Sequence, residues 1–146
     1  MKEQDRKEYP FTMPIQIYES SEDYLESILI LQKENGIVHS IDVANHLHFS
    51  KASVSVAMKK LRENGYINME KDGRLSLLPP GMEIAERIYE RHRVLTDFFV
   101  SIGIDQETAA KDACKIEHDL SDITFQKLKE AIAKMQESLM APASPQ

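Results

Sequence analysis

The sequence predicts a mainly α fold with one small β-hairpin, and two patterns along the chain indicate it. Apolar residues recur at helical spacing in six segments between residues 21 and 140. Residues 66–78 alternate roughly between apolar and polar around a polar tip at 71–74, which is typical of a hairpin. The first half therefore has the order helix, tight turn, helix, hairpin. This is the order of a winged helix-turn-helix, with the hairpin as its wing.

The first helix follows an N-terminal stretch that shows no periodicity. Residues 1–18 contain Pro10 and Pro14, and we interpret them as a flexible extension. A helix is predicted from about Ser21 to Lys33, because serines can cap it and acidic residues fill its first turn. Two more helices are predicted at residues 41–47 and 50–64, with a turn between them and Gly65 after them. Residues 19–80 are therefore expected to form the winged domain.

The second half is expected to be entirely helical. Residues 79–81 (PPG) separate it from the hairpin, and a long helix with one apolar stripe then ends near Gly103. Two further helices are predicted, at about residues 106–120 and from residue 121 or 122 to 140. We expect residues 81–140 to form one helical domain. Residues 141–146 (APASPQ) have the composition of a disordered tail.

Charge is distributed unevenly along the chain. The 146 residues carry a formal net charge of −6, which by itself argues against nucleic-acid binding. Residues 40–74, however, hold six Lys and Arg against four Asp and Glu, a local net charge of +2 within the predicted winged domain. No apolar run approaches the ~18 residues of a membrane span, and the polar N-terminus is unlike a secretory signal. These features predict a cytoplasmic protein with no membrane role.

The third predicted helix has the properties of a DNA-recognition helix. Its residues Val54, Met58 and Leu61 fall on one face and should point to the core, so Val56 and several hydroxyl and basic residues point outward. Such groups contact phosphates and base edges. An amphipathic helix pair with merely solvated lysines would show a similar pattern, but the hairpin that follows favours DNA binding. The candidate DNA-binding residues are Ser50, Lys51, Ala52, Ser53, Ser55, Lys59 and Lys60 on the helix, and Lys71 and Arg74 on the wing.

A second motif indicates a metal site. Cys114, Glu117 and His118 are spaced i, i+3, i+4, which places a thiol, a carboxylate and an imidazole on one face of a helix. The stripe Ala109, Ala113, Ile116, Leu120 runs beside them and is expected to face the core. His92 interrupts the apolar stripe of the long helix. On its own it fits either a metal ligand or a core histidine that a backbone group satisfies.

Four segments carry a resemblance to a known family: residues 22–28 (EDYLESI), 50–67 (SKASVSVAMKKLRENGYI), 90–95 (ERHRVL) and 112–118 (DACKIEH). Together the chain resembles the diphtheria-toxin-repressor family, and within it the short branch of manganese transport regulators. The resemblance implies a homodimer whose winged domains read a palindromic double-stranded operator, with metal bound between the winged domain and a helical dimerisation domain. The implied ligands are Asp23, Glu26, His92, Cys114, Glu117 and His118.

The sequence departs from both branches of that family. Manganese-type members usually carry glutamate at the position of Cys114, where iron-type members carry cysteine, whereas Asp23 and Glu26 follow the manganese pattern. Thr96 stands where iron-type members have a glutamate of their ancillary site. A thiolate favours Fe(II), Co(II) or Zn(II) over Mn(II). We therefore expect Mn(II) or Fe(II) as cofactor, with Co(II) or Zn(II) able to substitute, and leave open whether one or two ions bind.

These observations predict a transcriptional repressor of metal-ion uptake genes, activated by a divalent metal that fixes the dimer for operator binding. The main alternative is a metal-independent winged-helix regulator that responds to a small molecule or a partner protein. A metallohydrolase is a third possibility. It would need an open coordination position and a placed general base, and the sequence contains neither an H-E-x-x-H motif nor a Gly-rich phosphate loop.

Overall fold

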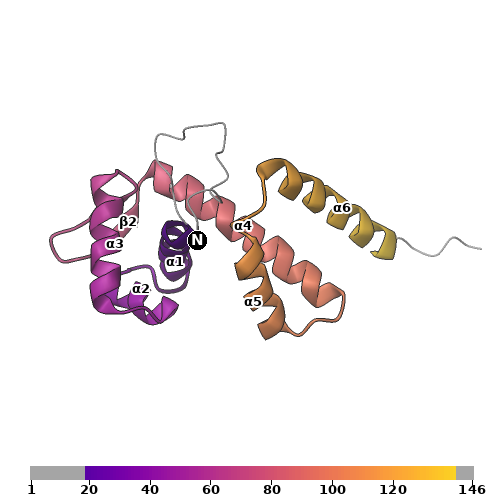
Figure 1. Cartoon of the computed structure of the whole chain (residues 1–146), viewed down its shortest axis with the longest axis horizontal. Helices are drawn as coiled ribbons and strands as arrows, with labels where there is room; N and C mark the ends of the chain where they lie inside the picture. The colour runs from indigo at the N-terminus through magenta and orange to yellow at the C-terminus, as the bar shows by residue number, and fades with distance from the viewer. Residues whose placement is uncertain (1–18, 141–146) are drawn as a thin grey trace, which may run out of the picture.

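The computed structural model describes residues 19–140, which form six helices and one two-stranded sheet (Figure 1). The predicted extension at 1–18 and tail at 141–146 lie outside the described residues. The mainly α fold with a single hairpin after the helix-turn-helix is confirmed. The elements are α1 (Glu19–Asn35), α2 (Ser40–Leu47), α3 (Lys51–Glu63), β1 (Ile67–Met69), β2 (Leu75–Leu77), α4 (Pro79–Ser101), α5 (Gln106–Ile116) and α6 (Asp122–Met140).

The winged module packs α1, α2 and α3 around one apolar core. Leu25 and Ile28 of α1, Val43 of α2 and Val54 and Met58 of α3 are all buried there. The wing is the antiparallel pair β1 and β2, in which Asn68 lies opposite Ser76. A backbone hydrogen bond from Leu75 to Val38 (2.8 Å) ties the wing to the segment before α2. The wing is therefore fixed to the helix-turn-helix at the end of β2 that lies nearest the hairpin tip.

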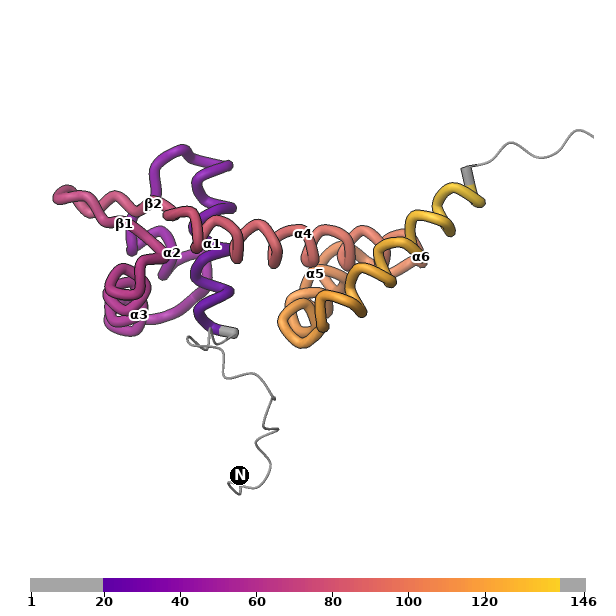
Figure 2. Tube along the Cα trace, turned by 90° about the horizontal axis from the view of Figure 1, so that it is seen from above, coloured from indigo at the N-terminus to yellow at the C-terminus, as the bar shows by residue number. Residues whose placement is uncertain are grey.

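The helix α4 connects the two halves of the molecule. It is about 35 Å long at 1.5 Å per residue, and Figure 2 shows it leaving the winged module and running along α5 and α6. The sequence suggested that Pro79-Pro80-Gly81 forms a separator, but these residues are the first turn of α4 itself. Proline suits that position, because the first helical N–H groups have no intrahelical acceptor. The wing thus passes directly into the long helix.

Gly81 allows this direct passage. It is buried, and a Cβ atom at this position would lie 2.1 Å from the carbonyl oxygen of Tyr66, the residue that precedes β1. Only a glycine permits the backbone of α4 to approach the hairpin so closely.

The helix α5 is shorter than the sequence suggested. It begins at Gln106 with Asp105 as its N-cap and ends at Ile116, so Glu117 and His118 lie at and just beyond its C-terminus. The expected apolar stripe is also partly wrong, since Ile116 is 38% exposed whereas Glu117 is fully buried. The buried side of the last turn of α5 therefore presents a carboxylate toward α4.

Among residues 19–140, no helix is both long enough and apolar enough to cross a lipid bilayer.

Candidate metal centre

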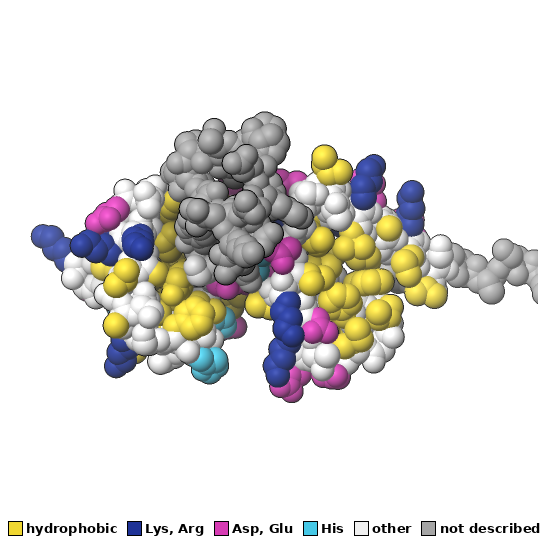
Figure 3. All heavy atoms as spheres, viewed as in Figure 1, with side chains coloured by type: hydrophobic (Ala, Val, Ile, Leu, Met, Phe, Trp, Pro, Cys, Tyr) yellow, Lys and Arg dark blue, Asp and Glu magenta, His cyan; other side chains and the backbone are white. Residues whose placement is uncertain are grey.

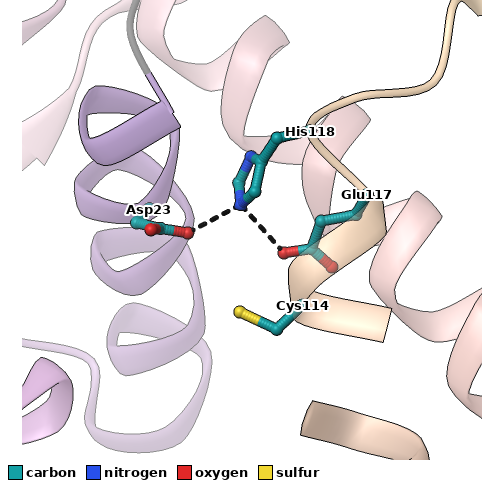
Figure 4. A group of neighbouring side chains, drawn as sticks. All are labelled: Asp23, Cys114, Glu117 and His118. Carbon is teal, nitrogen blue, oxygen red and sulfur yellow. Dashed lines mark ion pairs between the residues drawn. The ribbon is translucent and has the colours of Figure 1, made fainter. Parts of the chain in front are cut away.

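Four potential metal ligands meet where the winged module faces α5. One ligand atom from each of Asp23, Cys114, Glu117 and His118 lies within 4.8 Å of the other three. Figure 4 shows the imidazole of His118 between the carboxylates of Asp23 and Glu117, with the Cys114 thiol pointing toward α1. His118 Nε2 is 2.9 Å from Asp23 Oδ1 and 3.4 Å from Glu117 Oε1. We call this group the outer pocket.

A second group adjoins the outer pocket and shares one residue with it. Ligand atoms of Glu26, His92 and Glu117 also lie within 4.8 Å of one another, and we call them the inner pocket. Glu117 uses its two oxygens differently, because Oε2 is 2.8 Å from His92 Nδ1 whereas Oε1 faces His118. The six residues that the family resemblance implied as ligands are therefore brought together around the carboxylate of Glu117.

Helical spacing explains how these side chains converge. Asp23 and Glu26 are three residues apart on α1 and so share a face, while Leu25 and Ile28 point into the winged core. On the other side Glu117 keeps helical backbone angles (φ −60°, ψ −29°) although it follows the last residue of α5. Glu117 therefore still lies on the same face as Cys114, three residues before it, although α5 ends at Ile116.

A buried arginine holds the turn that carries Glu117 and His118. Arg91 is 3% exposed, and its guanidinium donates hydrogen bonds to the carbonyl oxygens of Glu117 and Leu120 and to the carboxylate of Asp122. It also stacks on Phe125 of α6 at 5.2 Å from the ring centroid. One side chain of α4 thus fixes the end of α5 and the start of α6.

Several polar atoms of the two pockets are buried without a partner. Within the described part of the chain, Glu117 Oε1, Glu26 Oε2 and both ring nitrogens of His118 accept or donate no hydrogen bond of good geometry. Leaving such atoms unsatisfied costs about 1–3 kcal/mol each. A cation in the outer pocket would be bound by Glu117 and one ring nitrogen of His118, and a cation in the inner pocket would be bound by Glu26. Carboxylate, imidazole and thiolate are the ligand types that divalent transition metals use. The residues present therefore fit a metal ion.

The pKa values of the cluster reflect carboxylates crowded into a buried space. Burial raises the pKa of Glu26 to about 7, and the neighbouring charge of Glu117 adds to that rise. The hydrogen bond to Glu117 raises the pKa of His92, against the opposing effect of burial. Burial lowers the pKa of His118, but the close polar contacts of its ring with Asp23, Cys114 and Glu22 outweigh burial and raise the pKa to about 12. Without a metal, protons stay on this site at neutral pH.

Sequence reasoning missed one residue that borders the outer pocket. Glu22 was interpreted only as an acid that favours the dipole of α1, but it is buried, and its Oε1 lies 3.5 Å from His118 Nδ1. Its other oxygen, Oε2, accepts a hydrogen bond from Arg87 of α4 at 3.2 Å. A carboxylate behind a ligating imidazole orients the ring and fixes its tautomer. Nothing in the local sequence distinguishes Glu22 from the other acids of that turn.

Two known domain families match consecutive parts of the chain. The N-terminal DNA-binding domain of iron-dependent repressors matches residues 16–75, and their metal-binding and dimerisation domain matches residues 79–141. The chain belongs to the iron-dependent repressor family. This confirms the resemblance to the diphtheria-toxin repressors.

Individual relatives of this repressor support the same assignment. An uncharacterized HTH-type transcriptional regulator of Methanocaldococcus jannaschii is 35% identical over 123 residues, which cover 83% of this chain and 98% of the relative. MntR of Geobacillus kaustophilus is 35% identical over 118 residues, covering 81% and 84%. A solved manganese-dependent transcriptional repressor in complex with manganese gives a TM-score of 0.71 at 25% identity, over 77% of this chain and 52% of that chain. The chain therefore spans about half the length of the solved relative.

The family assignment decides between the functions left open by the sequence. This protein is a metal-dependent DNA-binding transcriptional repressor, and it is not an enzyme. The expected metal-binding and DNA-binding classes are both confirmed, and the metallohydrolase alternative is excluded.

The structure leaves the predicted DNA-binding residues of the repressor exposed on the surface of the winged module. Ser50 caps α3 by accepting a hydrogen bond from the backbone N–H of Ser53 (3.2 Å). The other predicted residues on α3 are all exposed: Lys51, Ala52, Ser53, Ser55, Lys59 and Lys60. On the wing, Lys71 and Arg74 are exposed too, although Arg74 is paired with Asp72 at 2.8 Å. In Figure 3, basic side chains project from this end of the molecule.

Proposed function

We propose that this repressor binds two divalent transition-metal ions per subunit, one in each pocket, with Glu117 as the shared ligand. Ligation by α1 on one side and by α4 and the end of α5 on the other fixes the winged module against the helical domain. The observation that carries the proposal is the 2.9 Å approach of His118 to Asp23, since it joins the two halves of the chain at a single cluster of unsatisfied ligands.

The acidic residues explain why the conformation depends on a cation. Asp23 and Glu26 project from α1 toward Glu117, and like charges at this range repel each other. A bound divalent cation supplies the positive charge that makes this arrangement favourable. His92 and His118 must then give up the protons that their raised pKa values favour.

The ligand set favours mid-series transition metals. Carboxylates and imidazoles suit Mn(II) and Fe(II), and the Cys114 thiolate shifts the preference of the outer pocket toward Fe(II), Co(II) and Zn(II). A relative of known structure is described as manganese-dependent and contains manganese. We propose Mn(II) or Fe(II) as the physiological metal, with Co(II) or Zn(II) able to substitute.

An aromatic contact connects the outer pocket to the recognition helix. Tyr24, next to Asp23 on α1, packs edge-on against Phe49, with ring centroids 5.8 Å apart at an angle of 74°. Phe49 directly precedes Ser50, the N-cap of α3. A shift of α1 toward or away from α5 therefore moves the start of the helix that contacts DNA.

The dimer converts this shift into operator recognition. The helical half carries the dimerisation domain of the family, and Figure 3 shows apolar side chains gathered over the end of α4 and over α6. Exposed apolar residues of this half include Val100, Ile102, Ile116, Ile123, Met135 and Leu139. Two recognition helices at a fixed spacing match the half-sites of a palindrome.

The metal must also supply enough free energy to favour the DNA-binding conformation. Moving the population of that conformation from 1:99 to 99:1 would require about 5.5 kcal/mol of differential metal affinity. DNA should tighten metal binding in return.

We further propose that the operators lie upstream of metal-ion uptake genes and that the protein acts in the cytoplasm, where that DNA is found. Under this proposal the repressor stops metal uptake once both pockets are filled.

Single-residue variants separate the two pockets. Asp23→Asn removes a ligand from the outer pocket alone, Glu26→Gln removes one from the inner pocket alone, and Glu117→Gln affects both. Asp119→Asn is the matched control, because Asp119 is an exposed neighbour of His118 outside both groups. Calorimetric titration with Mn(II) and Co(II) should give two ions per subunit for the wild type and the control. It should give one for each single-pocket variant, and binding at least about 10-fold weaker for Glu117→Gln.

Operator binding by the same variants tests the regulatory part. Fluorescence anisotropy on duplexes selected from random DNA should show metal-dependent binding in the wild type and Asp119→Asn, and none in Glu117→Gln or His118→Ala. Equal operator affinity with and without metal in the wild type would sink the proposal. Wild-type stoichiometry in Glu117→Gln would remove the shared-ligand arrangement.

A further inference from the structure

The outward face of α3 lacks the side chains that usually read bases by paired hydrogen bonds. Residues 51–60 contain no Arg, Asn or Gln, which are the residues that bind guanine or adenine bidentately. The lysines at 51, 59 and 60 mainly supply phosphate contacts, and serine hydroxyls pair with either donors or acceptors. The helix therefore binds DNA with groups that discriminate weakly between bases.

Two apolar side chains occupy the centre of this face. Val56 is 56% exposed, and Ala52, one turn before it, is exposed as well. Neither contributes to the core, which α3 reaches through Val54, Met58 and Leu61. Val56 lies in an open groove that it lines together with Ser55, Lys59, Arg62 and Met69.

The surroundings of Val56 favour DNA over an apolar partner as its occupant. Lys59 and Arg62 stand in the same groove and give it a positive charge. A partner helix would have to desolvate both cations to reach Val56. A DNA major groove instead supplies phosphates for the cations and one kind of apolar group for the valine, the 5-methyl group of thymine.

Building on the DNA-binding function, we propose that Val56, with Ala52, determines sequence specificity by packing against thymine 5-methyl groups in the operator half-site. The contact distinguishes thymine from cytosine because cytosine has no such methyl group. It needs no hydrogen-bonding side chain and so fits the composition of this face. The operator is then expected to carry thymine at fixed positions opposite the first two turns of α3.

Deoxyuridine substitution tests this contact, because deoxyuridine differs from thymidine only by the missing methyl group. Operators are first selected from a random duplex library with the metal-loaded repressor. Each conserved thymine is then replaced singly by deoxyuridine, and affinity is measured by anisotropy. Loss of one buried methyl group should weaken wild-type binding about fourfold at one or two positions.

Two variants identify the residue responsible. Val56→Ala is exposed and replaces valine with a better helix former, so it retains the fold. In that variant deoxyuridine and thymidine should bind equally at the position that Val56 contacts. Lys59→Ala is the control and should weaken all operators alike while keeping the thymidine preference.

Two results would overturn the proposal. One is a selected operator without conserved thymines, and the other is a wild type that binds deoxyuridine and thymidine equally. If the Val56→Ala variant kept the full preference for thymidine, another residue would recognise the thymine methyl group, and the proposal would also be rejected. Failure of the underlying repressor function is distinguishable, because it would abolish selection of any sequence.

Discussion

His92 Nδ1 lies 2.8 Å from Glu117 Oε2, and this contact links the middle of α4 to the end of α5 inside the inner pocket. Both residues belong to the same potential ligand group, so the proton between them occupies a position that a metal ion would take. Protons and metal therefore compete for one site. The competition makes both the stability of the protein and its affinity for metal depend on pH.

The metal-free protein should lose stability as pH rises through neutrality. The pKa of Glu26 is raised from 4.5 to about 7, so the folded state bears a growing penalty as pH rises from about 5 to 7. The pKa values of His92 and His118 are raised above 6.5, so their stabilising effect is complete below that pH and is lost progressively above it. All three act in the same direction. Thermal unfolding with a chelator should give a lower Tm at pH 8 than at pH 6.

Bound metal should reverse this dependence of stability on pH. Because binding displaces protons from the same groups, metal affinity and the Tm of the metal-loaded protein should rise from pH 6 to pH 8. Calorimetry in buffers of different ionisation enthalpy counts the protons released. In the Glu26→Gln variant, the Tm of the chelator-treated protein should depend less on pH, but only below pH 7. A chelated protein that is more stable at pH 8 than at pH 6 would contradict the assignment.

The close approach of α4 to the wing predicts a cost for any side chain at position 81. In Gly81→Ala the new Cβ would meet the backbone oxygen of Tyr66, which cannot turn aside as a flexible side chain could. Such overpacking should destabilise the protein by about 1–3 kcal/mol. Glu83→Ala, an exposed change on the same helix, should have little effect. Urea unfolding of both variants measures the difference. Equal midpoints would show that the hairpin can shift away from the new side chain without loss of stability.

Arg91 should support both stability and metal affinity. Its removal leaves the carbonyl oxygens of Glu117 and Leu120 without their donor, at about 1–3 kcal/mol for each buried group. The turn that presents Glu117 and His118 is then free to shift. Arg91→Met should therefore unfold at lower urea concentration and bind Mn(II) more weakly.

The exposed change Lys127→Met should do neither. Loss of stability with unchanged metal affinity would reduce Arg91 to a purely structural role.

The architecture could be predicted because local patterns determine it. Caps, stop residues and apolar periodicity placed six helices and the hairpin, since each depends on residues within one or two turns. The end of α5 was placed four residues too late. Residues 117–120 continue the helical pattern of α5, but the turn they form depends on Arg91, which donates to carbonyls 26 and 29 positions away. No local pattern reveals such a donor.

The metal centre was predictable only in part from the residues alone. Cys114, Glu117 and His118 share one turn, so their spacing was sufficient. Asp23 and Glu26 came from the family resemblance, because acids near a helix N-terminus are already explained by the helix dipole. Glu22 fits that explanation equally well, yet it faces His118. Only the packing of α1 against α4, which brings these acids close to the end of α5, separates these roles.

Cys114 should make the outer pocket selective and sensitive to oxidation. Its thiol is exposed and is the sulfur in a group otherwise made of oxygen and nitrogen ligands. Cys114→Ser should weaken Co(II) and Zn(II) binding more than Mn(II) binding, and should abolish the sulfur-to-cobalt charge-transfer absorption of the Co(II)-loaded protein. Hydrogen peroxide should convert the wild-type thiol to sulfenic acid or beyond and release metal from the outer pocket. Chelator-coupled absorption follows that release, and Cys114→Ser should resist it. Peroxide treatment that leaves wild-type metal affinity intact would mean that Cys114 stays outside the coordination sphere.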